Sequence, residues 1–252
     1  MSQCNPWGRN APRLIAVIMI LLAPLASAEE RPKVGLVLSG GGAKGMAHVG
    51  VLRVLEEMRV PVDLVVGTSA GSAVGALYAS GMPVSDIEQR FIEMDWLSSF
   101  RDDPGRVYKP VRRKQDDWRF PVVPGIGVRA DGLRVGGGLI AGQNLGFILN
   151  ELTHNAALVE DFDRLPIPFR AVATDLETGE QVVIDEGNLS EAIRASMSIP
   201  GVYAPVRWQG RLLVDGGVAN NLPVSVARDM GADIVIAVDI TDSLMQTDEL
   251  LE

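Results

Sequence analysis

Two short glycine-containing turns constrain the fold of this chain most, because each of them joins an apolar strand-like run to a helical run. The first turn is Ser-Gly-Gly-Gly-Ala-Lys-Gly at residues 39–45, after the apolar run 34–38. The second is Gly-Thr-Ser-Ala-Gly at residues 67–71, between the strand-like run 62–66 and the small apolar run 72–79. A strand, a tight turn and a buried helix in immediate succession are typical of α/β domains.

The same alternation continues from residue 33 onward and predicts βαβ units with a central, mostly parallel sheet. Helices are expected over 46–58 and 70–79, after Pro83, around 145–152, over 190–197 and from Pro223 to Gly231. Further strands are expected over 169–173, 181–184, 211–214 and 234–238, with a hairpin turn at 209–210.

The first 28 residues predict a cleavable secretory signal. Arg9 and Arg13 precede an apolar run over 14–25, and Ala-Ser-Ala follows at 26–28 with the spacing of a signal peptidase site. The apolar run is shorter than the roughly 20 residues that span a bilayer. We therefore expect an exported protein of a Gram-negative type of bacterium, located in the periplasm, at the outer membrane surface or outside the cell.

The remaining residues, 29–252, are expected to form one domain, since a chain of 252 residues is long enough for one sizeable α/β core. The acidic end at 241–252 has no evident stop signal, which leaves open a truncation at the C-terminus. The only cysteine, Cys4, lies in the expected signal, so thiol chemistry is excluded after cleavage. A formal net charge of −9 argues against nucleic acid as a partner.

Residues 106–120 form a locally basic segment, with interleaved aromatic side chains, in this acidic chain. Two interpretations stay open. One is a solvated surface loop. The other is a lid or rim that makes peripheral contact with a membrane, because positive charge and interfacial aromatic side chains both favour anionic lipid headgroups.

Ser69 is the candidate nucleophile of a serine hydrolase. It is expected at a strand-to-helix turn, where its small neighbours Gly67, Ala70 and Gly71 leave room for a crowded, strained backbone. A serine hydroxyl needs a base to take its proton and donors to stabilise the oxyanion that forms on attack. The sequence must therefore supply both.

Asp215 is the stronger candidate for the base. The two histidines, His48 and His154, each fall inside a helical pattern, which is typical of packed or surface histidines. Asp215 stands at the end of a strand and is followed by Gly216 and Gly217, which allow a tight turn that exposes the carboxylate. A structural Asp-Gly turn is the alternative. The carboxylate would act on the serine directly or through one water.

The first glycine turn also matches the dinucleotide fingerprint, but its context does not fit. A dinucleotide site needs an acidic residue at the end of the second strand, and Asp63 stands at the start. A phosphate loop needs Ser or Thr after the lysine, and Gly45 follows Lys44. The loop can still direct backbone amides at developing negative charge, as an oxyanion hole does.

The three motifs in this order, the glycine loop at 40–45, the serine turn at 67–71 and Asp-Gly-Gly at 215–217, resemble the patatin-like phospholipases, including bacterial members. The resemblance covers nearly all of residues 33–240. It is reinforced by three further segments, Ala-Thr-Asp-Leu-Glu-Thr-Gly at 173–179, Ala-Ser-Met-Ser-Ile-Pro-Gly at 195–201 and Asn-Asn-Leu-Pro at 220–223.

The resemblance implies a three-layer α/β/α catalytic domain with a Ser-Asp dyad, in which Ser69 is the nucleophile and Asp215 the base. It implies oxyanion donors from the loop and the helix after the serine, with motif residues around them. The candidate oxyanion-hole residues are Gly40, Gly41, Gly42, Ala43, Lys44, Gly45 and Ala70, and the turn residues are Gly67, Thr68, Gly71, Gly216 and Gly217. Neither a metal nor an organic cofactor is implied.

The function implied is hydrolysis of fatty acyl esters of phospholipids or other lipids, of the phospholipase A type, through an acyl-serine intermediate. Two alternatives stay open. The first is a broader esterase or acyltransferase that uses soluble acyl donors. The second is a catalytically silent module that binds lipid.

Overall fold

The computed structural model describes residues 31–95, 102, 110–111, 126–129, 132–135 and 138–241. The chain divides into two units, Met1–Pro32 and Lys33–Glu252, and the fold described below belongs to the second. The expected signal at 1–28 lies outside the described residues, as do the acidic end from residue 242 and, apart from residues 110 and 111, the basic segment 106–120.

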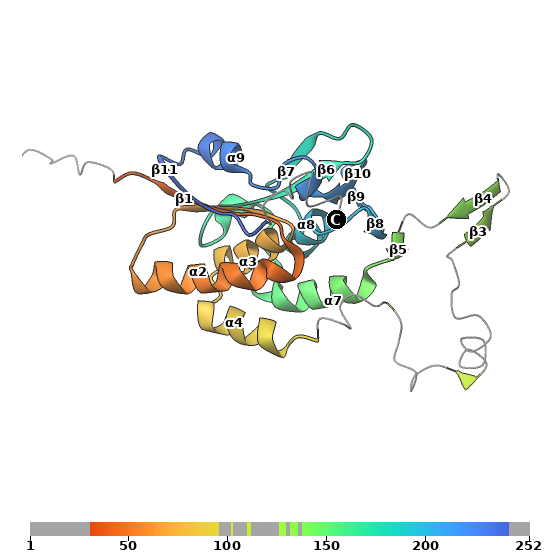
Figure 1. Cartoon of the computed structure of the whole chain (residues 1–252), viewed down its shortest axis with the longest axis horizontal. Helices are drawn as coiled ribbons and strands as arrows, with labels where there is room; N and C mark the ends of the chain where they lie inside the picture. Colours follow the sequence, from red (N-terminus) through yellow and green to blue (C-terminus); the bar gives the residue numbers. More distant parts are fainter. Residues whose placement is uncertain are drawn as a thin grey trace, which may run out of the picture. The chain divides into compact units, whose positions relative to one another are not determined.

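A seven-stranded mixed sheet forms the centre of the domain, in the strand order β11-β1-β2-β6-β10-β9, with β7 paired to β6 (Figure 1). Strands β11, β1, β2 and β6 are parallel to one another, whereas β7, β10 and β9 pair in antiparallel fashion. The strands are β1 (Val34–Leu38), β2 (Leu64–Thr68), β6 (Phe169–Asp175), β7 (Gln181–Ile184), β9 (Val206–Trp208), β10 (Arg211–Asp215) and β11 (Ile234–Val238). The predicted α/β fold with a central, mostly parallel sheet is confirmed.

Helices cover both faces of this sheet. Helix α9 packs on one face, and α2, α3, α4 and α7 lie on the other, where α8 also packs against β6 and β10 (Figure 1). The helices are α2 (Met46–Glu57), α3 (Ala70–Ala79), α4 (Val84–Glu93), α7 (Gln143–Leu152), α8 (Leu189–Ser196) and α9 (Val224–Asp229). None of the helices in the described ranges is both long enough and apolar enough to cross a membrane.

The central strands contribute side chains to the hydrophobic cores on both faces of the sheet, because successive side chains point to opposite faces. Leu36 and Leu38 of β1 join the larger core beneath α2 and α3, and Val37 joins the smaller core beneath α9. In β2, Val65 faces the larger core while Leu64 and Val66 face the smaller one. This period of two explains why these central strands read as continuous apolar runs.

Short elements connect these layers. They are the 3₁₀ turns η1 (Gly42–Gly45), η3 (His154–Ala156), η4 (Phe162–Arg164) and η5 (Gly216–Val218), the hairpin of β3 (Ile126–Arg129) with β4 (Gly132–Val135), and the parallel pair β5 (Gly138–Ile140) and β8 (Gly201–Tyr203). The predicted hairpin turn at 209–210 is confirmed: β9 and β10 are antiparallel, and Gln209 and Gly210 both have positive φ, as a two-residue hairpin turn requires.

Candidate active site

Ser69 occupies a strained turn between β2 and α3. Its φ of 51° and ψ of −121° lie in a region that a residue with a side chain seldom adopts. The turn is tightly enclosed: a Cβ at Gly67 would lie 2.5 Å from Cα of Ser72, and one at Gly71 would overlap the backbone of Leu38. Only glycine fits at these two positions while the serine holds this conformation.

The structure brings Ser69 and Asp215 together from positions 146 residues apart in the sequence. The Ser69 hydroxyl donates a hydrogen bond of 2.6 Å to Oδ2 of Asp215. Asp215 ends β10, and its other oxygen, Oδ1, accepts a bond of 2.8 Å from the amide of Gly217. Both side chains are buried, with 6 % and 7 % of the residue surface exposed for Ser69 and Asp215.

The surroundings of Asp215 make its carboxylate a stronger base. Burial raises the pKa of the carboxyl group above its usual value, and the hydrogen bonds from Ser69 and Gly217 offset part of that rise. A hydroxyl bonded to such a carboxylate can transfer its proton while its oxygen attacks an electrophile. The pair therefore has the distance and the environment that nucleophilic catalysis requires.

Two further hydroxyl groups fix the backbone of this pair. The amide of Ser69 donates to Oγ of Ser196 at 2.8 Å, and that hydroxyl donates to the carbonyl of Val172 at 2.5 Å. Thr174 donates its hydroxyl to the carbonyl of Asp215 at 2.9 Å. The sequence did not single out Ser196 or Thr174 individually, although both lie in segments that carry the family resemblance.

The backbone amides of the glycine loop fall into two groups. The Gly40 amide is 3.2 Å from Oδ1 of Asn221, and the Lys44 amide donates to the carbonyl of Gly41. By contrast, we find no acceptor within the described part of the chain for the amides of Gly41, Gly42 and Ala43. Gly42 and Ala43 also line the cavity that contains Ser69.

The remaining turn residues pack the motifs against one another. Gly45 lies so close to Ala70 that a Cβ on it would be 2.8 Å from the Ala70 Cβ, and Gly216 lies against the backbone of Val172. The Thr68 hydroxyl donates to the carbonyl of Asn220 at 3.0 Å. The loop, the serine turn and the aspartate turn are thus in mutual contact.

Neither histidine contacts this pair. His48 is fully buried, its Nε2 lies 2.8 Å from the carbonyl oxygen of Ser39, and burial lowers its pKa. The imidazole is therefore neutral and donates from Nε2 to that carbonyl. His154 is exposed in η3. Both histidines have the packed or surface positions that the sequence predicted.

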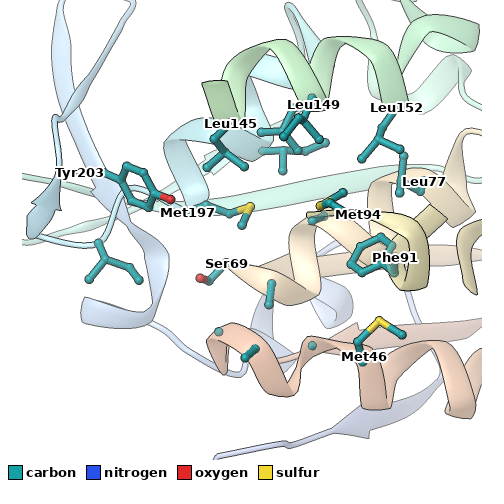
Figure 2. A pocket seen from close by; sticks show the side chains of 18 residues that line it. Met46, Ser69, Leu77, Phe91, Met94, Leu145, Leu149, Leu152, Met197 and Tyr203 are labelled. Atoms are coloured by element: carbon teal, nitrogen blue, oxygen red, sulfur yellow. The ribbon is translucent and has the colours of Figure 1, made fainter. Parts of the chain in front are cut away.

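An apolar cavity opens beside Ser69. Helix α3 contributes Ala73 and Leu77, α4 contributes Phe91, and α7 contributes Leu145 and Leu149 (Figure 2). The cavity volume is about 60 Å³. In the residues that the structure describes, no group of three or more His, Cys, Asp or Glu side chains is arranged to hold a metal ion. A serine hydroxyl beside an apolar cavity is an arrangement that can accommodate an acyl group.

Comparison with known proteins identifies the family. Residues 36–228 match the sequence profile of the patatin-like phospholipases. Patatin-like phospholipase domain-containing protein 6 of Homo sapiens is 38% identical over 209 residues, which cover 82% of this chain and 13% of that protein. Lysophospholipase NTE1 of Mycosarcoma maydis is 36% identical over 82% of this chain and 10% of its own length.

An NTE family protein of Mycobacterium tuberculosis is 33% identical over 84% of this chain, and the match covers 50% of that protein. The chain thus spans a tenth to a half of the length of these relatives. Among solved structures, VipD from Legionella pneumophila aligns with a TM-score of 0.48 and 18% identity, over 76% of this chain and 47% of that one. By the family profile and these relatives, the chain belongs to the patatin-like phospholipase family.

Proposed function

We propose that this chain is a lipid acyl hydrolase of the phospholipase A type that uses Ser69 and Asp215 as a catalytic dyad. The hydrogen bond of 2.6 Å between the serine hydroxyl and the aspartate carboxylate is the observation that carries the proposal. The strained backbone of Ser69, the apolar cavity beside it and the family membership support it.

In the first half-reaction, Oγ of Ser69 bonds to the acyl carbon while its proton passes to Asp215. The carbonyl oxygen becomes an oxyanion, and the amides of Gly41, Gly42 and Ala43 stabilise it by hydrogen bonds. The bond to the alcohol oxygen then breaks, and Asp215 returns the proton to the departing alcohol. The product at this stage is an ester between Ser69 and the fatty acid.

In the second half-reaction, a water molecule attacks the acyl carbon while Asp215 accepts a proton from it. The same amides stabilise the second oxyanion, and the bond to Ser69 breaks as the proton moves to its Oγ. The fatty acid leaves and the dyad is restored. In the net reaction, one ester and one water are consumed, and one alcohol and one fatty acid are formed.

The substrate we propose is a phospholipid or another lipid that carries an acyl ester. The Mycosarcoma maydis relative is named a lysophospholipase, and this chain matches a tenth of its length. The apolar lining of the cavity favours an aliphatic chain over a polar group, since burying apolar surface is favourable and burying unpaired polar groups is not.

We also propose that the protein is exported and that its basic and aromatic segment 106–120 makes peripheral contact with membranes. The first idea rests on the signal-like composition of residues 1–28, and the second on positive charge interleaved with aromatic side chains. Secretion of the full chain, with loss of the first 28 residues in mass spectrometry, tests the first idea. Retention of the uncleaved chain in the cytoplasm would contradict it.

Release of fatty acid from phospholipid vesicles tests the proposed chemistry. We expect Ser69→Ala and Asp215→Asn each to lower the rate by at least about a thousandfold, as removal of a nucleophile or its base does in other serine hydrolases. Ser85→Ala and Asp229→Asn make the same chemical changes at exposed positions of α4 and α9, and should leave the rate within about twofold.

The outcomes separate the two alternatives. Hydrolysis confined to short soluble esters would favour the broader esterase or acyltransferase. Vesicle binding without product, unchanged by Ser69→Ala, would favour the silent lipid-binding module. Full activity of either dyad variant would overturn the mechanism.

A further inference from the structure

The apolar cavity runs along one side of helix α3, starting at the helix end that carries Ser69. Ala70, Ala73 and Leu77 line it, at the spacing of three and four residues that places side chains on one helix face. Since a helix rises about 1.5 Å per residue, the eight steps along the chain from Ser69 to Leu77 correspond to about 12 Å of cavity.

The facing wall is helix α7, which contributes Leu145, Leu149 and Leu152 with the same spacing. In Figure 2, Ser69 lies between Tyr203 at one end of the cavity and the group of Leu77, Phe91 and Leu152 at the other. An acyl group attached to Ser69 therefore has an apolar path between two helices toward Phe91.

This path ends at the last turn of α4. Phe91 is buried and lines the cavity together with Met94, just beyond the helix. Met94 and Leu152 also line a second depression on their outer side, whose other residues include the charged side chains Arg90, Glu93 and Glu151. Together with Ile148, which lines both hollows, Met94 and Leu152 thus lie between the apolar cavity and a charged surface. An aliphatic chain gains no favourable burial of apolar surface by entering that surface.

The dimensions limit the chain that fits. An extended aliphatic chain advances about 1.25 Å per carbon, from a bond of about 1.5 Å and an angle near 111°, so 12 Å holds about ten carbons. The cavity volume of about 60 Å³ gives a smaller number of carbons. A group of the size of a water molecule needs about 10–15 Å³ of cavity volume, so only about four to six groups of that size fit.

We propose that Phe91 and Met94 determine acyl-chain length. The cavity then accommodates between about five carbons beyond the reacting carbonyl, the middle of the estimate from volume, and about ten carbons, the estimate from length. The inference rests on the proposed function, since it takes Ser69 as the point of attachment. Within the limit, each further buried methylene should raise kcat/KM by about fourfold. Beyond the limit, a longer chain must displace Phe91 or Met94, so kcat/KM stops rising.

Hydrolysis of p-nitrophenyl esters with acyl chains of about four to about sixteen carbons tests the limit in the full chain. We expect kcat/KM to rise with chain length and to reach its maximum between about six and about eleven carbons. Met94→Ala and Phe91→Ala should each move the maximum toward longer chains by about two carbons or more. Ala73→Leu narrows the path one helical turn from Ser69, so this variant should move the maximum of kcat/KM toward shorter chains.

Phe147→Ala is the matched control, since Phe147 lies on α7 but is 73% exposed and does not line the cavity. Its chain-length profile should be that of the unchanged protein. A rise that continues to the longest ester, or a maximum that stays in place in folded Met94→Ala, would overturn the inference. Met94 is only partly buried, so this variant is expected to fold even if Phe91→Ala does not.

Binding of free fatty acids to Ser69→Ala, measured by calorimetry, separates this inference from the proposed function. If no ester is hydrolysed, the proposed chemistry fails, but affinity should still rise about fourfold per methylene and level off within the same range of lengths. An affinity that rises without levelling off, or no binding at any length, would overturn the assignment of Phe91 and Met94.

Discussion

At the scale of single residues, the amide of Ser69 has a hydroxyl partner that stabilises an unfavourable backbone conformation. The positive φ of this residue is of the kind that costs about 1–3 kcal/mol, so the surrounding structure must supply that free energy. The hydrogen bonds from the Ser69 amide to Ser196, and from Ser196 to Val172, connect the turn to β6. Because the Ser69 amide donates to Ser196, it is not one of the amides that we propose as oxyanion donors.

Ser196→Ala should therefore misplace Ser69, the proposed nucleophile. The variant leaves a buried amide without an acceptor, which lowers the free energy of unfolding by about 1–3 kcal/mol, and we expect kcat to fall by about tenfold or more. Urea unfolding and vesicle hydrolysis measure the two effects.

Ser190→Ala is the matched control, because Ser190 is equally buried on α8 but bonds to Asn150 and Asn188, outside the dyad. We expect a comparable loss of stability with kcat within about twofold. Equal losses of kcat in the two variants would mean that Ser196 acts only through general stability.

The raised pKa of Asp215 predicts opposite effects of pH on activity and on stability. Asp215 accepts a proton only when it is ionised, so kcat/KM should increase as the pH rises through its elevated pKa. The folded state holds this proton more tightly than the unfolded state does. Stability from this group is therefore present below the unfolded pKa and is lost as the pH rises through the folded pKa.

Measurements of kcat/KM and of Tm as a function of pH test whether activity rises while stability from this group falls. At a pH high enough to ionise the buried wild-type carboxylate, Asp215→Asn should unfold at an equal or higher temperature while activity is lost. A lower Tm for this variant at such a pH, with the difference growing as pH rises, would contradict the assignment of the shift to burial.

At the scale of structural elements, one side chain joins the glycine loop to the turn that follows β10. Asn221 accepts from the amide of Gly40 through Oδ1 at 3.2 Å and donates to the carbonyl of Gly40 through Nδ2 at 3.3 Å. These bonds occupy the Gly40 amide, so the oxyanion donors that we propose are the amides that follow it in the loop. They also connect the loop to the segment that follows Asp215.

Asn221→Ala should lower kcat by about tenfold or more, because the loop amides no longer have a fixed orientation toward the oxyanion. Asn220→Ala is the neighbouring control: its side chain bonds to the exposed Gln181, and its backbone carbonyl, which accepts from Thr68, is kept. We expect KM to change by less than about threefold in both variants. A loss confined to KM in Asn221→Ala would place this residue in substrate binding.

At the scale of the whole molecule, the sequence predicts the fold class and much of the secondary structure, because both depend on local periodicity. The apolar spacing predicts the central strands and helices over 46–58, 70–79 and around 145–152, and the structure has these helices at 46–57, 70–79 and 143–152. Strand β6 is longer than expected and continues to Asp175, where it pairs with β10 and β7. The end of a strand depends on its partners in the sheet, which a local pattern does not contain.

The candidate site could be predicted only in part for the same reason. The structure brings Ser69 and Asp215 within hydrogen-bonding distance, as the motifs suggested, but their roles in catalysis stay predictions. The hydroxyl of Ser196 and the side chain of Asn221 act across more than a hundred residues of sequence, so their bonds depend on the tertiary register. Serine and asparagine are common in turns, and spacing gave no sign of these particular bonds.

The order of strands in the sheet has a consequence for protein synthesis. Strand β1, which leads into the glycine loop, lies between β2 and β11, and the amide of Ser39 donates to the carbonyl of Val238. The loop therefore has its native neighbours only after the ribosome has released β11, which follows the loop by most of the length of the domain. Because domains generally fold as units, the proposed catalytic pair and its glycine loop are expected to be assembled late, after β11 has joined the sheet.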